Sequence, residues 1–324
     1  MSEQYTVGVV GAGQISAEAH LPVLRALPQA QVLWVADRQA ERAALVGRGH
    51  GIAGIPMPER AEDLPPADVV LLAIPYGARP PLYPALAARG AAIYVEKPFA
   101  MTPAEHDAIV APFGPSRVAC GLQRRAAGGA VLLRRLLRAG AFGPLRRAVV
   151  EFGVPGARSG SYQYDARLAG AGLLFDVGVH ALDLALHATD ARSLQLRERH
   201  AMPGRHAELE LNAAFDVESA AGPFRLELLV SALRFTAQQN RFEFDGATLV
   251  HDLWGSGGLR LEDDDGTACE LSPAGAPYPA SGHELLAAFW RSVFDALDTG
   301  RPNESSAVTS RLTTEALALA YSWL

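Results

Sequence analysis

A glycine-rich segment near the start of the chain, VGVVGAGQIS at residues 7–16, constrains the fold more than any other feature. It sets Gly11, Gly13 and Ser16 in a Gly-x-Gly-x-x-small pattern between an apolar run and a segment with helical spacing. Gly11 permits a tight turn, Gly13 lets a pyrophosphate approach the backbone, and Ser16 allows close packing of helix on strand. The helix N-terminus then offers free N–H groups to phosphate. The pattern predicts a dinucleotide-binding loop.

The first 122 residues alternate apolar runs with helical segments. The predicted strands are 5–10, 31–37, 69–75, 91–98 and 117–122, and the predicted helices are 15–27, 41–49, 81–90 and a segment from Thr102. Repeated strand–helix units imply a parallel sheet with right-handed crossovers. We therefore expect residues 1–122 to form a doubly wound Rossmann domain that binds a dinucleotide, with Gln14 and Ile15 among its contacts.

Beyond residue 122 the pattern changes. Helices are predicted at 128–139, 172–189, 282–299 and 307–323, and strands at 146–154, 207–217, 224–236, 240–250, 258–262 and 267–272. Strands that follow one another without helices between them indicate an antiparallel or mixed sheet. The expected fold class is therefore α/β: a Rossmann domain, then an α+β domain over residues 123–324 with an antiparallel or mixed sheet.

The composition narrows the class of protein. A chain of 324 residues suggests two domains, and 49% hydrophobic with 20% charged residues is typical of a globular protein. The net charge is −6 and no long basic run occurs, so neither nucleic acid nor a membrane is an expected partner. No signal-peptide pattern is found. Cys120 and Cys269 are interpreted as reduced, buried thiols, so we expect a cytoplasmic protein.

An acidic residue follows the second predicted strand. Asp37 lies 24 residues after Gly13, where a carboxylate can accept hydrogen bonds from both ribose hydroxyls of NAD and would repel the 2′-phosphate of NADP. Arg38 follows at once and could stack on adenine or pair with that phosphate. NAD is the favoured cofactor, and NADP stays an alternative. An ordinary helix cap is the alternative role for Asp37.

Among 29 lysine and arginine residues, Lys97 is the only lysine. It stands in YVEKPFA, residues 94–100, at the end of a predicted strand. An ammonium changes its pKa readily when buried or crowded, whereas a guanidinium stays protonated. Ligands of an open α/β sheet bind beyond the carboxyl ends of its strands, where Ile74, Pro75 and Lys97 lie. We interpret Lys97 as a reactive group near the nicotinamide, with compositional drift as the alternative.

A second set of ionisable residues lies on one predicted helix. Asp176, His180, Asp183 and His187 follow one another at steps of four, three and four, which places them on one helical face. Such groups on an apolar helix are costly unless they are paired or used. We interpret His180, with Asp176, as the group that exchanges the proton of a substrate hydroxyl.

Two alternatives apply to this helix. His180 could be satisfied by Asp183, with His187 a surface group near the helix end. A metal could also bind these side chains, but no His-x3-His or cysteine pattern supports it, so no metal is expected.

Together these motifs resemble the Gfo/Idh/MocA oxidoreductases (glucose–fructose oxidoreductase, inositol dehydrogenase and relatives), over nearly the whole chain. The Glu-Lys-Pro motif of that family stands here as 96–98, and its Gly-rich segment before an Asp-x3-His helix stands here as Gly170-Ala171-Gly172 before Asp176 and His180. The resemblance implies NAD(P)-dependent oxidation or reduction of a sugar, amino sugar or cyclitol. It also implies that the second domain has a large open, mostly antiparallel sheet for substrate binding. The face of that sheet would build a homodimer or homotetramer.

The resemblance also implies residue roles. Lys97 would contact both nicotinamide ribose and substrate, His180 would be the acid/base, and Asp176 would orient substrate or His180. Glu96 is expected to join the cofactor contacts.

The chain departs from the family pattern at two places. Where the family has Thr-Pro-Asn-x-x-His, residues 74–79 read IPYGAR, so that Tyr76 and Arg79 stand in place of Asn and His. We still expect Ile74, Pro75 and Arg79 to contact the cofactor.

The second departure is QRRAAG at 123–128, which lacks the usual aromatic-x-Pro and leaves Arg124 and Arg167 to bind an anionic or keto substrate. Tyr162 and Tyr164 either line that pocket or pack on a strand.

The sequence therefore predicts an NAD(P)-dependent dehydrogenase or reductase acting on a CH–OH group of a small-molecule substrate. Alternatives are a hydrolase or lyase that oxidises its substrate transiently with NAD, an imine or tetrapyrrole reductase, and a non-catalytic nucleotide-sensing regulator.

Overall fold

The structure is a computed structural model that describes residues 4–155, 172–203, 208–254, 257–263, 265–272, 279 and 281–322. The chain divides into two compact units. The first comprises Met1–Ala100, Ala104–Gln123 and Gly282–Thr309, and the second comprises Met101–Pro103, Arg124–Ser281 and Ser310–Leu324. The chain thus leaves the first unit after Gln123, close to the expected boundary. In contrast to the expected division, the segment Gly282–Thr309 packs with the first unit.

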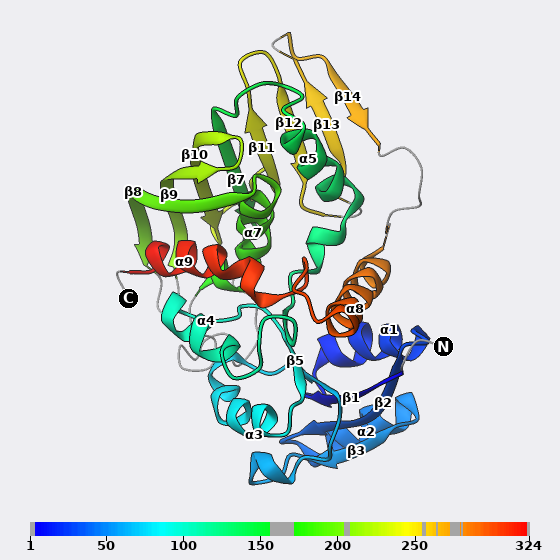
Figure 1. Cartoon of the computed structure of the whole chain (residues 1–324). Helices are drawn as coiled ribbons and strands as arrows, with labels where there is room; N and C mark the ends of the chain where they lie inside the picture. Colours follow the sequence, from blue (N-terminus) through cyan, green and yellow to red (C-terminus); the bar gives the residue numbers. More distant parts are fainter. Residues whose placement is uncertain are drawn as a thin grey trace. The chain divides into compact units, whose positions relative to one another are not determined.

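The first unit contains a six-stranded parallel sheet (Figure 1). Its strands are β1 (Tyr5–Val10), β2 (Ala30–Asp37), β3 (Ala53–Pro56), β4 (Val69–Leu72), β5 (Ala92–Val95) and β6 (Val118–Cys120). Their order is β3-β2-β1-β4-β5-β6, which is the Rossmann order and confirms the predicted fold class. Every residue of β4 and β5 is buried, as expected when helices cover both faces of a sheet.

Helices and short helical turns connect these strands. They are η1 (Ser16–His20), α1 (Leu21–Ala26), α2 (Ala40–His50), η2 (Ala61–Asp63), η3 (Tyr76–Ala78), η4 (Pro80–Leu82), α3 (Tyr83–Ala88) and α4 (Pro103–Val110). From far along the chain, α8 (Gly282–Thr299) packs beside α1 (Figure 1), and η7 (Ala307–Ser310) follows it. Phe289, Trp290 and Phe294 of α8 belong to the same apolar cluster as Val7 and Leu24. Helix α8 therefore completes the Rossmann core.

The second unit is built on an eight-stranded sheet in the order β14-β13-β12-β11-β7-β10-β9-β8. The strands are β7 (Arg147–Gly153), β8 (Ala191–Pro203), β9 (Glu208–Ser219), β10 (Gly222–Ser231), β11 (Gln239–Glu243), β12 (Thr248–Asp252), β13 (Leu259–Glu262) and β14 (Ala268–Leu271). Only β7 and β10 pair in parallel, so the sheet is mostly antiparallel, as predicted. The accompanying helices are η5 (Gln123–Ala126), α5 (Gly128–Arg138), η6 (Leu174–Gly178), α7 (Val179–Ala188) and α9 (Arg311–Ala320).

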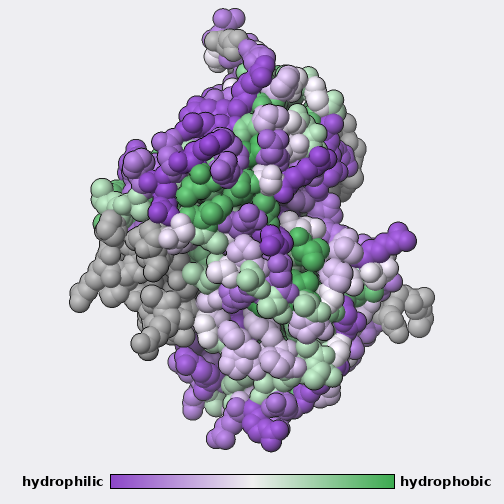
Figure 2. Space-filling model, turned by 60° about the vertical axis from the view of Figure 1, so that its left-hand side comes forward, coloured by the Kyte–Doolittle hydropathy of each residue, from purple (hydrophilic) through white to green (hydrophobic). Residues whose placement is uncertain are grey.

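One face of this sheet is covered by helices and the other is open. Along β7, Ala148, Val150 and Phe152 are buried, while Arg147 and Glu151 on the alternate side are partly exposed. The open face carries charged pairs across strands, among them Arg147–Glu227, Arg147–Glu243, Arg225–Glu198 and Arg241–Glu262. Hydrophilic side chains dominate the upper part of the face seen in Figure 2, with one hydrophobic patch among them.

Three sequence expectations need correction. The strand predicted at 240–250 is wrong: it is a hairpin of β11 and β12, and the Asp245-Gly246 pair is the turn signal that divides it. Strands β3 and β8 were not predicted, because they are edge strands without clear apolar alternation. Cys269 is exposed rather than buried, although both cysteines are free thiols. Within the residues that the structure describes, no helix is long and apolar enough to cross a membrane.

Candidate active site

The glycine-rich loop has the geometry that the sequence predicts. Gly11 adopts φ +105°, and a Cβ placed there would lie 2.4 Å from the carbonyl oxygen of Ala73, so only glycine fits. A Cβ on Gly13 would meet nothing within 4 Å, so open space lies in front of this part of the backbone. The loop is therefore closed against β4 at Gly11 and accessible at Gly13, as a phosphate-binding loop requires.

The helix after the loop begins with Gln14 and Ile15, both exposed, and Ser16 is fully buried where a small residue was expected. Residues Ser16–His20 form a π-helical turn, a feature that is frequent at functional sites. The extra residue in that turn changes which side chains face the sheet. It brings His20 into the buried interior, which the sequence did not indicate.

Asp37 at the end of β2 binds the loop directly. Its Oδ2 accepts the N–H of Ala12 at 2.8 Å, and its Oδ1 accepts the N–H of Gln39 at 2.9 Å. The second contact lies before α2, whose N-cap is Gln39, so Asp37 is not the helix cap that was considered, and the first contact ties it to the dinucleotide loop. The carboxylate is only half-buried, so lone pairs can still accept from a ribose. Arg38 beside it is exposed. The loop, the helix N-terminus and Asp37 together fit a dinucleotide.

The glutamate beside Lys97 is held by a buried histidine. The Nε2 atom of His20 lies 2.9 Å from Oε1 of Glu96, and the indole N–H of Trp290 donates to Nδ1 of His20 at 3.0 Å. An indole can only donate, so Nδ1 is the acceptor and the proton of the ring is on Nε2, pointing at the carboxylate. The histidine ring also meets Tyr94 edge-on, at 5.2 Å between ring centroids. Two aromatic rings therefore fix His20, and His20 fixes Glu96.

Electrostatics keep Glu96 ionised. Burial alone raises the pKa of its carboxyl, but the hydrogen bond from His20 and the charges of Lys97 and Arg79 outweigh burial, so the net pKa is lowered. Lys97 itself is half-buried at the carboxyl end of β5. Lys97 follows Glu96 directly in the sequence, and the opposite charges of the two groups attract each other. Neither His20 nor Trp290 was among the predicted site residues, because each lies far from Lys97 in the sequence.

Arg79 has a different environment from the one expected. It is buried, and its guanidinium donates to the carbonyl oxygens of Ile74 at 2.9 Å and of Pro98 at 2.5 Å. It thereby joins the loops that follow β4 and β5. The hydroxyl of Tyr76 donates to Glu105 on α4. Arg79 therefore braces the loops around Pro75 and Lys97, and Tyr76 ties the first of them to α4. Direct contacts of Ile74, Pro75 and Arg79 with a nucleotide stay predictions.

In the second unit, Asp176 lies in the π-helical turn η6 and His180 lies in α7, which continues the same helix. The start of this helix is capped by Glu208 from β9, whose Oε1 accepts the N–H of Leu174 at 3.0 Å and the hydroxyl of Tyr321 at 2.7 Å. An anion at a helix N-terminus is stabilised by the helix dipole. A Cβ on Gly172 would lie 1.6 Å from Oε2 of Glu208, so glycine is required there.

The remaining acid of this helix has a structural partner. Asp183 is buried and accepts two hydrogen bonds from Arg125, from Nε at 2.8 Å and from Nη2 at 2.5 Å. The hydroxyl of Thr313 on α9 donates to it at 2.8 Å. The contacts of Asp183 thus hold η5, α7 and α9 together, and Arg125 is its ion-pair partner.

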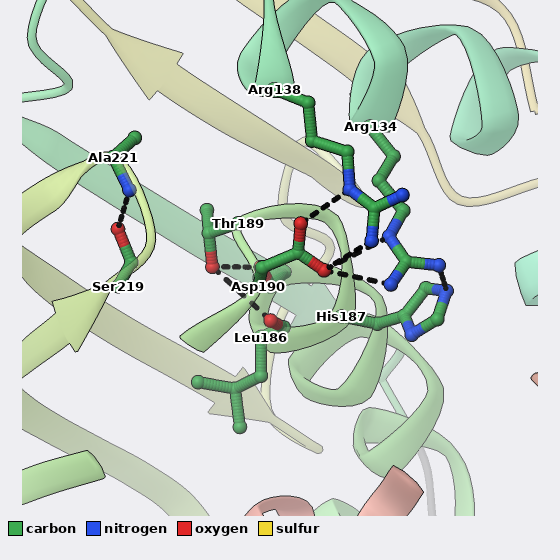
Figure 3. A network of polar contacts seen from close by, with 9 residues as sticks. Arg134, Arg138, Leu186, His187, Thr189, Asp190, Ser219 and Ala221 are labelled. Carbon is green, nitrogen blue, oxygen red and sulfur yellow. Dashed lines mark hydrogen bonds and ion pairs between the residues drawn. The ribbon is translucent and has the colours of Figure 1, made fainter. Parts of the chain in front are cut away.

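His187 is not the surface group that the sequence suggested. Figure 3 shows it at the end of α7 beside Arg134, whose Nη1 lies 2.9 Å from its Nε2. Asp190 accepts from Arg134 and Arg138 of α5 in the same network. Burial lowers the pKa of His187 to about 2, and the repulsion of Arg125 and Arg134 adds to the effect. His187 is therefore neutral at physiological pH and clamps two helices together.

The structure describes only some of the predicted substrate-binding residues. Arg124 lies in η5, donates to the carbonyl oxygen of Leu253 and stacks on the Trp254 ring, with Cζ 5.0 Å from the ring centroid. Tyr162 and Arg167, together with Tyr164, Gly170 and Ala171, lie outside the described residues. Among the residues that are described, no three His, Cys, Asp or Glu side chains group closely enough to hold a metal ion.

Comparisons with known proteins agree with this geometry. Residues 5–118 match the family model described as "Oxidoreductase family, NAD-binding Rossmann fold", and residues 131–248 match the GFO/IDH/MocA C-terminal domain. A dTDP-3,4-didehydro-2,6-dideoxy-alpha-D-glucose 3-reductase from Streptomyces antibioticus is 29% identical over 191 residues. That alignment spans 57% of each of the two chains, little more than half the length of that relative.

Two solved structures share the whole fold. An aldose-aldose oxidoreductase from Caulobacter crescentus, complexed with glycerol, has a TM-score of 0.84 and 19% identity, covering 99% of this chain and 97% of that one. A 3-ketoreductase from Actinomadura kijaniata, in complex with NADP and TDP-benzene, has a TM-score of 0.81 and 18% identity, covering 99% and 98%. With both domain models matched in order and the phosphate loop, Lys97, Asp176 and His180 in place, this chain belongs to the Gfo/Idh/MocA family of oxidoreductases.

Proposed function

We propose that this protein is an NAD(P)-dependent oxidoreductase that transfers a hydride between the nicotinamide and a hydroxyl or keto carbon of a sugar, amino sugar or cyclitol. The observation that carries the proposal is the placement of the only lysine, at the carboxyl end of β5, beside a buried glutamate held by His20. The residues that match the family's Asp-x3-His motif, Asp176 and His180, lie on a helix whose start is fixed by Glu208. Curated and structural relatives that act on sugars support the same class of substrate.

The chemistry assigns separate tasks to these residues. A bound nicotinamide supplies or accepts the hydride. Nζ of Lys97 and a ring nitrogen of His180 hold and move the proton of the substrate hydroxyl, because alcohol oxidation releases that proton and ketone reduction consumes it. The Asp176 carboxylate orients the substrate or the His180 ring. Glu96 keeps Lys97 in place, and Arg79 fixes the two loops beside it.

For the cofactor we propose NAD as the preferred form. The support is the half-buried carboxylate of Asp37, which is held toward the loop by Ala12 and would repel a 2′-phosphate. The exposed Arg38 and the NADP bound by one structural relative keep NADP as the second form to test.

For the assembly we propose a homodimer or homotetramer formed through the open sheet face. The support is a wide sheet with helices on one side only and half-exposed Val149 and Leu229 between its charged pairs. Sedimentation equilibrium of the protein and of Glu227→Arg would test this: we expect a dimer or tetramer that the charge reversal weakens. A monomer at micromolar concentration would refute it.

The function is tested by two measurements in sequence. Calorimetric titration with NAD and NADP should give binding of one of them in the micromolar range or tighter, as is ordinary for working cofactor sites. Sugars, amino sugars and cyclitols are then screened in both directions by absorbance of the reduced nicotinamide. Turnover without net change of the cofactor would favour a hydrolase or lyase instead, and failure to bind either nucleotide would refute the proposal.

A further inference from the structure

Two adjacent arginines in η5 have opposite environments. Arg125 is buried and forms a bidentate ion pair with Asp183. Arg124 is half-buried, and among the described residues its contacts are the carbonyl oxygen of Leu253 and the face of the Trp254 ring. Desolvation lowers the pKa of Arg124, and no carboxylate of the described residues forms an ion pair with it. A half-buried guanidinium is well suited to pair with an anionic ligand through charge-assisted hydrogen bonds.

The ring that stacks on Arg124 is exposed but firmly held. Trp254 is 45% exposed, which is unusual for so large an apolar side chain. Its indole N–H donates to the side-chain oxygen of Gln238, and its ring contacts the ring of Phe152 at 5.9 Å between centroids. Arg124 supports it from a further direction. Three neighbours therefore fix the orientation of the ring while leaving part of its surface free to stack on a ligand.

Gln238 carries backbone strain to make this arrangement. It adopts φ +54°, the left-handed region that side chains other than glycine, asparagine and aspartate rarely occupy. Its side-chain amide donates to the carbonyl oxygen of Gly153, and its own carbonyl accepts the N–H of Leu253 at 3.1 Å. One strained residue thus ties the end of β7 to the loop after β12. Strain of this kind is concentrated at ligand sites.

Arg124 and Trp254 lie on the same side of the sheet as the Asp176–His180 helix. A Cβ on Gly178, between those two residues, would touch Val230 on β10 at 3.1 Å. Val230 pairs in register with Phe152 on β7, and Phe152 contacts Trp254. The helix turn therefore lies against β10 and the tryptophan lies against β7, and these two paired strands are about 5 Å apart. That spacing suits a part of the substrate next to, but distinct from, the reacting carbon.

We infer that Arg124 and Trp254 form a subsite for the nucleoside diphosphate of a nucleotide-linked sugar, with the base stacked on Trp254 and the diphosphate paired with Arg124. This inference rests on the proposed function, because it names the substrate class of the same site. Nucleobases stack on exposed aromatic side chains, and a guanidinium pairs with phosphate through charge-assisted hydrogen bonds. Among the described residues no carboxylate pairs with Arg124, and an uncharged sugar or cyclitol would not supply one.

The first experiment measures nucleotide binding without turnover. UDP and dTDP are titrated into the wild type, Trp254→Ala, Trp254→Phe and Arg124→Met by calorimetry, with tryptophan fluorescence as a second readout. Arg146→Met serves as the matched control, because Arg146 is an exposed arginine of the same unit paired with Asp245. We expect the nucleotide affinity to fall about tenfold or more for Trp254→Ala and Arg124→Met. It should fall less for Trp254→Phe and stay at the wild-type value for Arg146→Met.

The titrations also distinguish a site for the nucleotide of the substrate from a site for the cofactor NAD. NAD is titrated into the same variants, and we expect its Kd to be unchanged in Trp254→Ala. Loss of NAD affinity together with UDP affinity would overturn the inference, since the ring would then serve the cofactor. Equal UDP and dTDP affinities in the wild type and in Trp254→Ala would overturn it as well. Thermal melts show whether each variant folds, and Trp254→Phe covers the case in which the alanine variant does not.

Turnover distinguishes failure of this inference from failure of the proposed function. With nucleotide-linked sugars, the loss in Trp254→Ala should appear mainly in KM, whereas a merely structural role would lower kcat and the melting temperature. Wild-type turnover of free sugars or cyclitols with no measurable affinity for UDP or dTDP would refute the subsite and leave the oxidoreductase function standing. Variant-sensitive nucleotide binding with no redox turnover of any sugar would support the subsite and refute the function.

Discussion

Each of the two units contains a buried glutamate close in the fold to residues that we propose for proton transfer, but the two glutamates have different partners. Glu96 stands next to Lys97 in the sequence and is bound by the ring of His20, with a pKa lowered by His20, Lys97 and Arg79 against the effect of burial. Glu208 lies 34 residues after Leu174 at the start of the helix it caps, and its partners are a backbone N–H and the hydroxyl of Tyr321.

The difference separates electrostatic from geometric control. Glu96 carries a charge that the hydrogen bond from His20 and the nearby cations stabilise, so its removal should act through charge. Glu208 acts on the position of a helix start, because it fills the space over Gly172 and satisfies the N–H of Leu174. Both are associated with a π-helical turn, η1 over His20 and η6 over Asp176, where an extra residue redirects the side chains.

The largest effects should come from the groups that handle the proton, which set the scale for both units. Lys97→Ala and His180→Ala should each lower kcat by about 10²–10⁴-fold, the usual contribution of general acid–base catalysis. Steady-state kinetics and NAD titration measure this, and binding of NAD should persist in His180→Ala. Lys97→Arg is the matched control: it keeps a cation but cannot give up a proton, so it should not restore the rate. Wild-type kcat in either alanine variant would remove that residue from the mechanism.

Gly172→Ala should break the geometric side of the comparison. The new Cβ would lie 1.6 Å from Oε2 of Glu208, so the carboxylate or the helix start must move. Overpacking of this kind costs about 1–3 kcal/mol, which urea denaturation measures as a lower midpoint. Gly49→Ala in α2 is the control, because a Cβ there meets nothing within 4 Å and should be neutral or slightly stabilising. Equal midpoints for both variants would show that Glu208 does not fill this space.

Glu96→Gln should sharpen the electrostatic side. The substitution keeps the shape but removes the charged acceptor for His20, and hydrogen bonds to charged groups contribute about 1.5–3 kcal/mol. Since the folded pKa of Glu96 is lowered, its charge stabilises the protein above the unfolded value near 4.5, and that stabilisation is lost as the pH falls through the lower folded value. The wild type and Glu96→Gln should thus differ in unfolding free energy at pH 7 and converge in acid. A constant difference at every pH would argue against an ionic role.

His187→Gln should have the smallest effect at neutral pH and should appear on acidification. The folded pKa of about 2 lies below the ordinary 6.5, so only the unfolded chain binds a proton in that interval, and the wild type loses stability as the pH falls. One proton corresponds to about 1.4 kcal/mol for each pH unit. Glutamine can still accept from Arg134 and does not titrate, so this variant should become more stable than the wild type by pH 5. Parallel melting curves at pH 7 and pH 5 would contradict the assignment.

The part of the fold that could be predicted from the sequence was predicted from local patterns. Strand and helix periodicity, Gly11 and Gly13, and the change of pattern after residue 122 predicted both sheets and the order of most elements. The prediction failed where the sequence pattern is weak, namely at the edge strands β3 and β8 and at the hairpin turn inside 240–250. Edge strands bury little, so they place few demands on their sequence.

For the site, the sequence by itself determined the residues whose chemistry or backbone admits no substitute. Gly11 needs a positive φ, Lys97 stands alone among arginines, and Asp176 and His180 share a helix in a recognisable spacing. Their positions in the fold were read correctly because each follows a strand or lies on a helix.

Only the tertiary structure decided what supports them. Trp290 donates to His20, which lies 270 residues away in the chain, and His20 in turn binds Glu96. Glu208 binds the N–H of Leu174, and the ion-pair partner of Asp183 is Arg125 rather than His180. A buried carboxylate must find donors wherever packing supplies them, because it cannot stay unpaired away from water. No local pattern encodes which distant donor that is, so the supporting shell of this protein becomes visible only when the chain is folded.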